Sequence, residues 1–180
     1  MEIIHFTSEE KWDSIQSSGY LLPKTHPDNF NRNSLSDLKK TIQFDEYIVG
    51  IPVDKYSGWK DALLTHRLWQ YTSYEVVLKF PVTWPTTTFV RDHQLLSPGR
   101  FRDDLKINIM DHYFGIGAGR IDDNQKNVVE SYEKKFMKDY NLSSILLEEY
   151  GGKYNAPEVW SPQVTPTSLI ERISFRDIPK

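Results

Sequence analysis

The sequence lacks cysteine and long apolar runs. None of its 180 residues is a cysteine, which excludes disulfide bonds and cysteine-ligated zinc and fits a cytoplasmic protein. No apolar run reaches the roughly 20 residues that span a membrane, and no signal peptide precedes the first predicted strand, so we expect no membrane partner. Histidine and acidic residues are not clustered at the spacing of a metal site, so we also expect no metal.

The sequence has no excess of basic residues either. It carries 22 lysines and arginines against 25 acidic residues, a net charge of -3. This argues against a strongly basic, sequence-independent nucleic-acid binder, although it allows a local basic groove. The length suits one domain, residues 1–180, and 38% hydrophobic residues can bury a core.

The N-terminal stretch combines a predicted strand with a predicted helix. Ile3–Thr7 is β-prone, Ser8 is a typical N-cap followed by two glutamates, and Gly19 is a typical helix end. His5 and Thr7 therefore lie between a strand end and a helix start, where polar side chains often meet ligands. A structural junction with a satisfied histidine is the alternative.

Predicted elements along the rest of the chain do not alternate regularly between strand and helix. This order favours an α+β fold over a doubly wound parallel sheet. Strands are predicted at 47–53, 74–82, 86–90, 144–150, after 154 and at about 169–175, and helices at 34–44, 58–71, 105–114 and 124–140. A G-x-G-x-G run at 115–119 precedes two aspartates that would repel a phosphate, which argues against a phosphate-binding loop.

Four segments, in order, resemble a known family. The His-x-Thr strand end with its following helix resembles the opening of ADP-ribosyltransferase-like domains. Residues 75–78 with 89–94, residues 100–105 (RFRDDL) and the segment PEVWSP at 157–162 resemble stretches of the DarT-type DNA ADP-ribosyltransferase toxins. The resemblance implies an α+β domain with a split mixed β-sheet core and flanking helices, and NAD as the substrate.

The resemblance also implies roles for particular residues. Glu158 matches the catalytic glutamate of the family. Cleavage of the nicotinamide–ribose bond gives an oxocarbenium-like state, which a fixed carboxylate stabilises. His5 would hold the adenosine-side ribose, with Thr7 as a second polar contact. His93 could act as a general acid or base, or belong to an ordinary Asp-His turn.

Aromatic and basic residues are candidates for the remaining contacts. Tyr47, Tyr56 and Trp59 are each candidates for stacking on nicotinamide. Arg91, Arg100 and Arg102 form a local basic cluster that could contact a nucleic-acid backbone. The same cluster could equally be a solvated face.

The chain departs from the family at one functional position. The family has an arginine in the segment that corresponds to residues 47–63, and this segment contains none. The leading prediction is an NAD-dependent ADP-ribosyltransferase that modifies DNA, RNA or a protein side chain in a bacterial or phage toxin–antitoxin or defence system, with an antitoxin or immunity partner. The alternatives are a non-catalytic NAD- or nucleotide-binding sensor or decoy, and a nucleic-acid-binding module.

Overall fold

The structure is a computed structural model that describes a large part of the chain. It describes residues 1–23, 47–55, 76–96, 138–174 and 177–178, together with residues 127, 131, 134 and 135. The helices predicted at 34–44, 58–71 and 105–114 lie outside the described residues. The four single residues and 138–142 are helical, in agreement with the helix predicted at 124–140.

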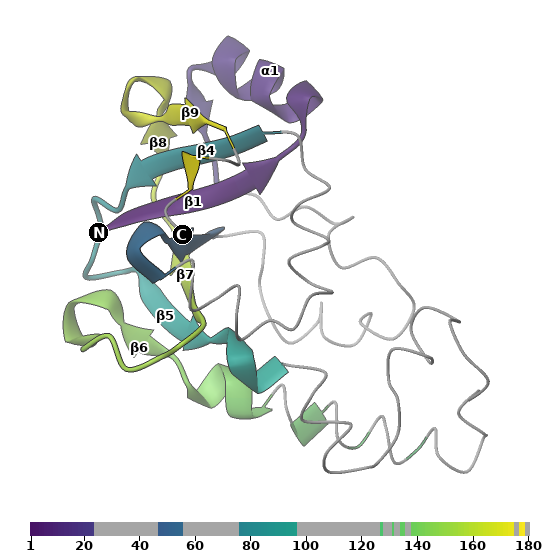
Figure 1. The fold of residues 1–180 in the computed structure, drawn as a ribbon, viewed down its shortest axis with the longest axis vertical. Coiled ribbons are helices and arrows are strands. Elements are labelled where there is room, and N and C mark those ends of the chain that lie inside the picture. Colours follow the sequence, from purple (N-terminus) through teal and green to yellow (C-terminus); the bar gives the residue numbers. More distant parts are fainter. Residues whose placement is uncertain are drawn as a thin grey trace.

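A seven-stranded sheet forms the centre of the described fold (Figure 1). Its strand order is β6-β5-β7-β3-β1-β4-β9. The strands are β1 (Glu2–Thr7), β3 (Ile48–Pro52), β4 (Val76–Pro81), β5 (Phe89–Asp92), β6 (Ile145–Leu146), β7 (Pro157–Ser161) and β9 (Glu171–Ile173). Every described pairing is antiparallel. The α+β prediction is confirmed, whereas the expected mixed sheet is wrong for the described strands.

Helix α1 (Glu9–Ser18) forms where the local sequence predicts it. The Ser8 side chain accepts a hydrogen bond from the backbone N–H of Lys11, and Gly19 ends the helix with φ 78°. Only glycine adopts this left-handed conformation at little cost. Trp12 and Ile15 are buried on the helix face that packs on the sheet.

Short elements interrupt the longer strands expected near the C-terminus. The 3-10 helix Leu147–Glu149 follows β6, and the 3-10 helix Thr167–Leu169 precedes β9. In each, a backbone N–H bonds back three residues, as in Ile170 N to Thr167 O at 3.1 Å. A second sheet joins β2 (Tyr20–Leu21) to β8 (Thr165–Pro166), and the sequence gives no periodic signal for strands this short.

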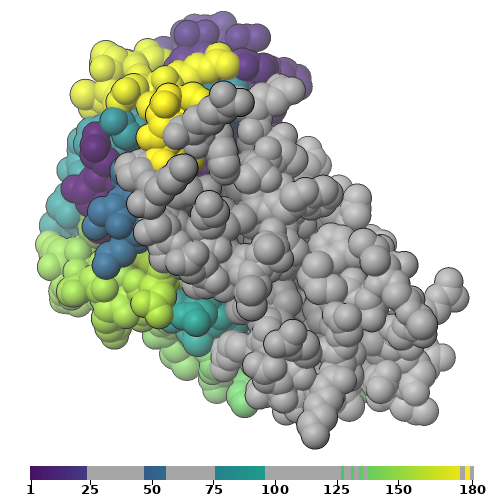
Figure 2. Space-filling view, viewed as in Figure 1, coloured from purple at the N-terminus to yellow at the C-terminus, as the bar shows by residue number. Residues whose placement is uncertain are grey.

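Side chains alternate between the two faces of the large sheet, as the two-residue period of a strand requires. One face, which α1 covers, carries Ile3 and Val159 in one apolar cluster. The opposite face carries Ile4 and Ile51 in another. β9 lies beside α1 in Figures 1 and 2, and Arg172 of β9 forms an ion pair with Glu9 of α1.

The sheet is joined only partially between β1 and β3. β1 pairs with β4 over all six of its residues, but with β3 only where Ile3 and Ile4 face Pro52 and Ile51. Beyond this joint the two strands are not paired. We call this unpaired stretch the split, and it divides the sheet into one half with β1, β4 and β9 and another with β3, β7, β5 and β6.

We predict that Gly50→Ala destabilises the protein. A Cβ at Gly50 would lie 2.8 Å from the backbone oxygen of Ile4, which the strand pairing holds in place. Such overpacking typically costs about 1–3 kcal/mol. Gly151→Ala is the matched control, because a Cβ there meets no atom within 4 Å. Equal free energies of unfolding for the two variants in urea titrations would contradict a close approach at the joint.

Candidate functional site

Glu158 lies in the middle of the larger half of the sheet. It is the second residue of β7 and faces Arg91 of β5 across one pairing. β3 lies on the other side of β7, and extending the β3–β7 pairing by one residue places Ile51 opposite Glu158. The exposed fraction of Glu158 is 3%. A carboxylate buried to this degree requires hydrogen-bond or charge partners.

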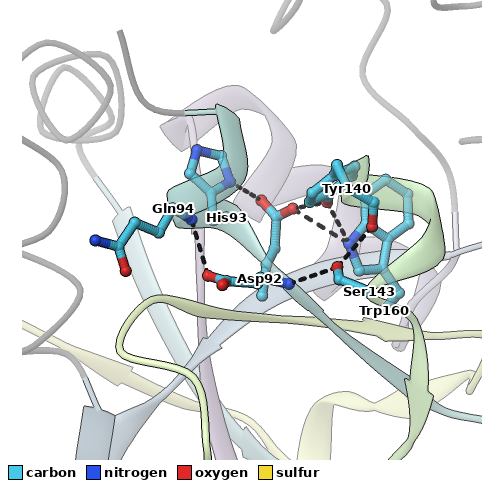
Figure 3. A network of polar contacts seen from close by, with 7 residues as sticks. Asp92, His93, Gln94, Tyr140, Ser143 and Trp160 are labelled. Atoms are coloured by element: carbon cyan, nitrogen blue, oxygen red, sulfur yellow. Dashed lines mark hydrogen bonds and ion pairs between the residues drawn. The ribbon is translucent and has the colours of Figure 1, made fainter. Parts of the chain in front are cut away.

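Three side chains that Figure 3 labels, Tyr140, Trp160 and His93, surround the Glu158 carboxylate. The Tyr140 hydroxyl donates a hydrogen bond to Oε2. The Trp160 indole Nε1 donates to the same oxygen at 3.2 Å and to the Tyr140 hydroxyl at 3.0 Å. His93 Nδ1 lies 3.2 Å from Oε1, which is ion-pair distance when the imidazole is protonated. Each carboxylate oxygen therefore has a polar side-chain atom within 3.2 Å.

Burial, followed by the charge of Glu158, raises the pKa of Tyr140 well above its usual value. The phenol therefore keeps its proton at all ordinary pH values and remains a donor to Glu158. The nearby guanidinium of Arg91 opposes this shift. The charges of Glu158 and Arg91 thus both act on Tyr140.

Local hydrogen bonds place His93 at the end of β5. Its backbone N–H donates to Ala156 O at 2.9 Å. Asp92 begins the 3-10 helix His93–Leu96 by accepting from the backbone N–H of Gln94 at 3.0 Å. The turn predicted for Asp-His is therefore present, and it directs a 1% exposed imidazole at Glu158.

Arg91 and Tyr47 belong to one group of side chains, the aromatic cluster, which comprises the rings of Tyr47, Phe89, Tyr140 and Trp160 and the Arg91 guanidinium. Phe89 and Trp160 are stacked with centroids 6.0 Å apart, and Tyr47 meets both edge-on. The Arg91 guanidinium carbon lies 4.7–5.2 Å from the ring centroids of Phe89, Tyr140 and Trp160. Its Nε donates to Ser144 Oγ at 2.9 Å.

His5 lies at the split between β1 and β3. Its Nδ1 is 2.8 Å from the carbonyl oxygen of Val49, which can only accept, so Nδ1 carries the proton. Burial lowers the pKa of His5 below 6.5, against the opposing effect of this hydrogen bond. The imidazole is therefore neutral at pH 7 and its Nε2 is an acceptor. Thr7, two residues on, is 3% exposed.

His5 and Glu158 extend from opposite faces of the sheet. His5 pairs with Leu78, which packs in the same apolar cluster as Val159. Glu158 is adjacent to Val159 in β7 and so points to the other face. Thr7 shares the face of His5 because it lies two residues away. A cleft on one face cannot be lined by both His5 and Glu158.

The structure thus brings together some of the predicted site residues and separates others. Glu158 and His93 are in contact, with Arg91 and Tyr47 in the surrounding aromatic cluster. His5 and Thr7 lie apart from them. Tyr56, Trp59, Arg100 and Arg102 lie outside the described residues, so their predicted roles stay predictions.

Sequence reasoning missed Tyr140 and Trp160. Trp160 follows Glu158 by two residues on one strand, so the period of a strand could have placed both on one face. Tyr140 comes from a helix 18 residues earlier in the chain. Its contact with Glu158 has no signal in the local sequence.

The described residues contain neither a candidate metal site nor a membrane-spanning helix. Among them, no group of three or more histidine, aspartate or glutamate side chains could hold a metal ion. Within the same residues, no helix has the length and apolarity to cross a membrane. Comparisons of the chain with protein-family models, curated proteins and solved structures found no match.

We predict that Tyr140→Phe destabilises the protein. The substitution keeps the ring but removes the donor to a buried carboxylate, and leaving such a group unsatisfied costs about 1–3 kcal/mol or more. Tyr20→Phe is the control, because the Tyr20 side chain is exposed. Chemical denaturation of both variants measures the difference. A loss for Tyr140→Phe no larger than that for Tyr20→Phe would contradict the hydrogen bond.

We predict that His5 makes stability fall in acid. Because burial lowers its pKa in the folded state, the unfolded chain binds a proton more readily, and stability is lost as the pH drops below about 6.5. His5→Asn should remove the part of the pH dependence that comes from His5. The asparagine amide still offers a hydrogen-bond donor to Val49 O. Urea unfolding at a series of pH values compares the two proteins. Parallel pH profiles would show that His5 is not titrating in this way.

Proposed function

We propose that this chain is an NAD-dependent ADP-ribosyltransferase of the DarT-like type, with Glu158 at its reaction centre. The observation that carries the proposal is the geometry of Glu158: a buried carboxylate fixed by Tyr140 and Trp160 and in contact with His93. The family resemblance assigns the catalytic role to this same glutamate. An ADP-ribosyltransferase-like fold is part of the proposal, and the split between β1 and β3 supports it.

A fixed carboxylate suits the chemistry of this reaction. Loss of nicotinamide from NAD leaves positive charge on the ribose C1′ and ring oxygen. A preorganised negative group in a water-poor site stabilises that charge without reorganisation during the reaction. We propose that His93, whose Nδ1 lies 3.2 Å from Glu158 Oε1, exchanges a proton with the acceptor nucleophile.

Sugar binding requires one of the present contacts of Glu158 to be replaced. The carboxylate is 3% exposed, Tyr140 and Trp160 donate to Oε2, and His93 Nδ1 lies 3.2 Å from Oε1. A ribose 2′-hydroxyl is a donor of the same kind as the Tyr140 hydroxyl. We infer that the ribose takes the place of Tyr140 on Oε2, so substrate binding includes a movement of this side chain.

His5 would bind the adenosine-side ribose of NAD, at the opposite end of the dinucleotide from nicotinamide. The neutral imidazole keeps Nδ1–H on Val49 O and presents Nε2 as an acceptor for a ribose hydroxyl. The two ends of NAD are separate nucleotides, so His5 and Glu158 need not touch. The split at His5 is where the pairing between the two halves of the sheet is interrupted, and we propose that NAD reaches both halves there.

The acceptor and partners rest on the resemblance alone. We propose a nucleic-acid base, DNA foremost, or a protein side chain as the acceptor, and an antitoxin or immunity protein as the partner of a toxin acting in the cytoplasm. Arg100 and Arg102 remain the candidates for a nucleic-acid backbone.

A second candidate function is a non-catalytic member of the fold that binds NAD or another nucleotide. Two observations favour it: the closed environment of Glu158 and the placement of His5 on the opposite face. In this case the Glu158 cluster is a buried polar network that stabilises the fold. The absence of the family's arginine from residues 47–63 agrees with this candidate.

We predict that Glu158→Gln abolishes most transfer while leaving NAD binding intact. Glutamine keeps the size of the side chain but removes its charge, and loss of one preorganised electrostatic group costs about a hundred- to a thousand-fold in rate. Labelled NAD is incubated separately with DNA, RNA and lysate protein, and NAD affinity is measured by calorimetry on the same preparation. The matched control is Glu148→Gln, because Glu148 is exposed.

Three outcomes separate the candidates. Loss of transfer in Glu158→Gln alone supports the enzyme. Full transfer in that variant contradicts the catalytic role of Glu158. A wild-type protein that binds NAD but labels none of the acceptors favours the non-catalytic candidate.

A further inference from the structure

We propose that Arg91 is the charge partner of Glu158, a positioning residue that keeps the buried carboxylate ionised and oriented. Its part in the reaction rests on the proposed function, whereas its coupling to Glu158 does not. This role differs from the nucleic-acid contact predicted from the sequence.

The strand register places the two residues side by side. Arg91 of β5 pairs with Glu158 of β7 in an antiparallel ladder. Directly opposed residues project from the same face with their Cβ atoms about 4.5–5.5 Å apart. Arg91 also influences the pKa of Tyr140, whose hydroxyl is bonded to Glu158. Its positive charge therefore acts within the Glu158 network.

The rings of the aromatic cluster restrain the guanidinium. Its carbon lies 4.7 Å from the Phe89 centroid, 4.8 Å from that of Trp160 and 5.2 Å from that of Tyr140. A cation over aromatic faces is attracted by their negative centres. The bond from Nε to Ser144 Oγ fixes its direction. Tyr140 and Trp160 thus contact both Arg91 and Glu158. The two charged side chains therefore share two neighbouring rings.

The chemistry of the carboxylate explains why a permanent cation is needed. Burial favours the neutral acid, and a neutral acid cannot stabilise an oxocarbenium. The described groups around Glu158 are His93, Tyr140, Trp160 and Arg91. Histidine is charged only when protonated, and the other two rings are neutral donors. Arg91 alone among these four is charged at every relevant pH.

A double-mutant cycle on stability tests the coupling without requiring activity. The proteins are wild type, Arg91→Met, Glu158→Gln and the double variant, unfolded in urea at pH 7. Arg91→Met should raise the equilibrium constant for unfolding in both backgrounds. We expect the factor to be about five times larger when residue 158 is glutamate than when it is glutamine. Equal effects in both backgrounds would overturn the proposal. If Arg91→Met folds only in the Gln background, the coupling is supported; if it folds in neither, Arg91 serves packing and the proposal fails.

The pH profile of ADP-ribosyl transfer tests the role in the reaction. We expect the acid limb of Arg91→Met to move to higher pH by about one unit, because Glu158 then protonates more readily. Arg91→Lys retains the charge and should lie closer to wild type. Arg172→Met is the control, since Arg172 pairs with Glu9 at the surface. An unshifted profile for Arg91→Met would overturn this role. A wild type without transfer would refute the proposed function, while the stability cycle would still decide the coupling.

Discussion

The backbone pairing of two residues of β1 with two of β3 is the constraint on which the described sheet depends. Ile3 and Ile4 facing Pro52 and Ile51 are the described pairs that connect the half containing β4 to the half containing β7. The strands approach so closely that Gly50 has no room for a Cβ. Past this joint the pairing ends, and the His5 side chain instead bonds a β3 carbonyl. The joint thus fixes where the sheet is continuous and where it is split.

In the other half, Glu158 and Arg91 lie on one face of the sheet. Glu158 is nearly as buried as the apolar core, and it is tolerated there because Tyr140 and Trp160 donate to it and Arg91 is its cross-strand neighbour. Loss of either donor would leave a buried carboxylate with fewer hydrogen bonds, which is costly. The same hydrogen bonds that satisfy the buried carboxylate also hold it in position.

Local sequence predicted the elements whose stabilising contacts are local. Ser8 and Gly19 sit at the ends of α1 because capping and left-handed backbone depend on neighbouring residues. The β-branched run in β4 was likewise recognisable as a strand. β2 and β8 were not, because two-residue strands have no period to detect. The ends of the strands expected at 144–150 and 169–175 were also missed, since short turns with internal hydrogen bonds replace them.

For the candidate site, the sequence by itself determined the residue types and their alternation along β7, which puts Glu158 and Trp160 on one face. It also indicated His93, which follows directly from β5. Tertiary structure alone decided that Tyr140 closes over the carboxylate, that Arg91 lies beside it and that His5 points to the other face. The physical reason is that these relations depend on strand order and register. Those are set by pairings between residues far apart in the sequence, as in Ile48 of β3 with Ser161 of β7, and no local pattern encodes them.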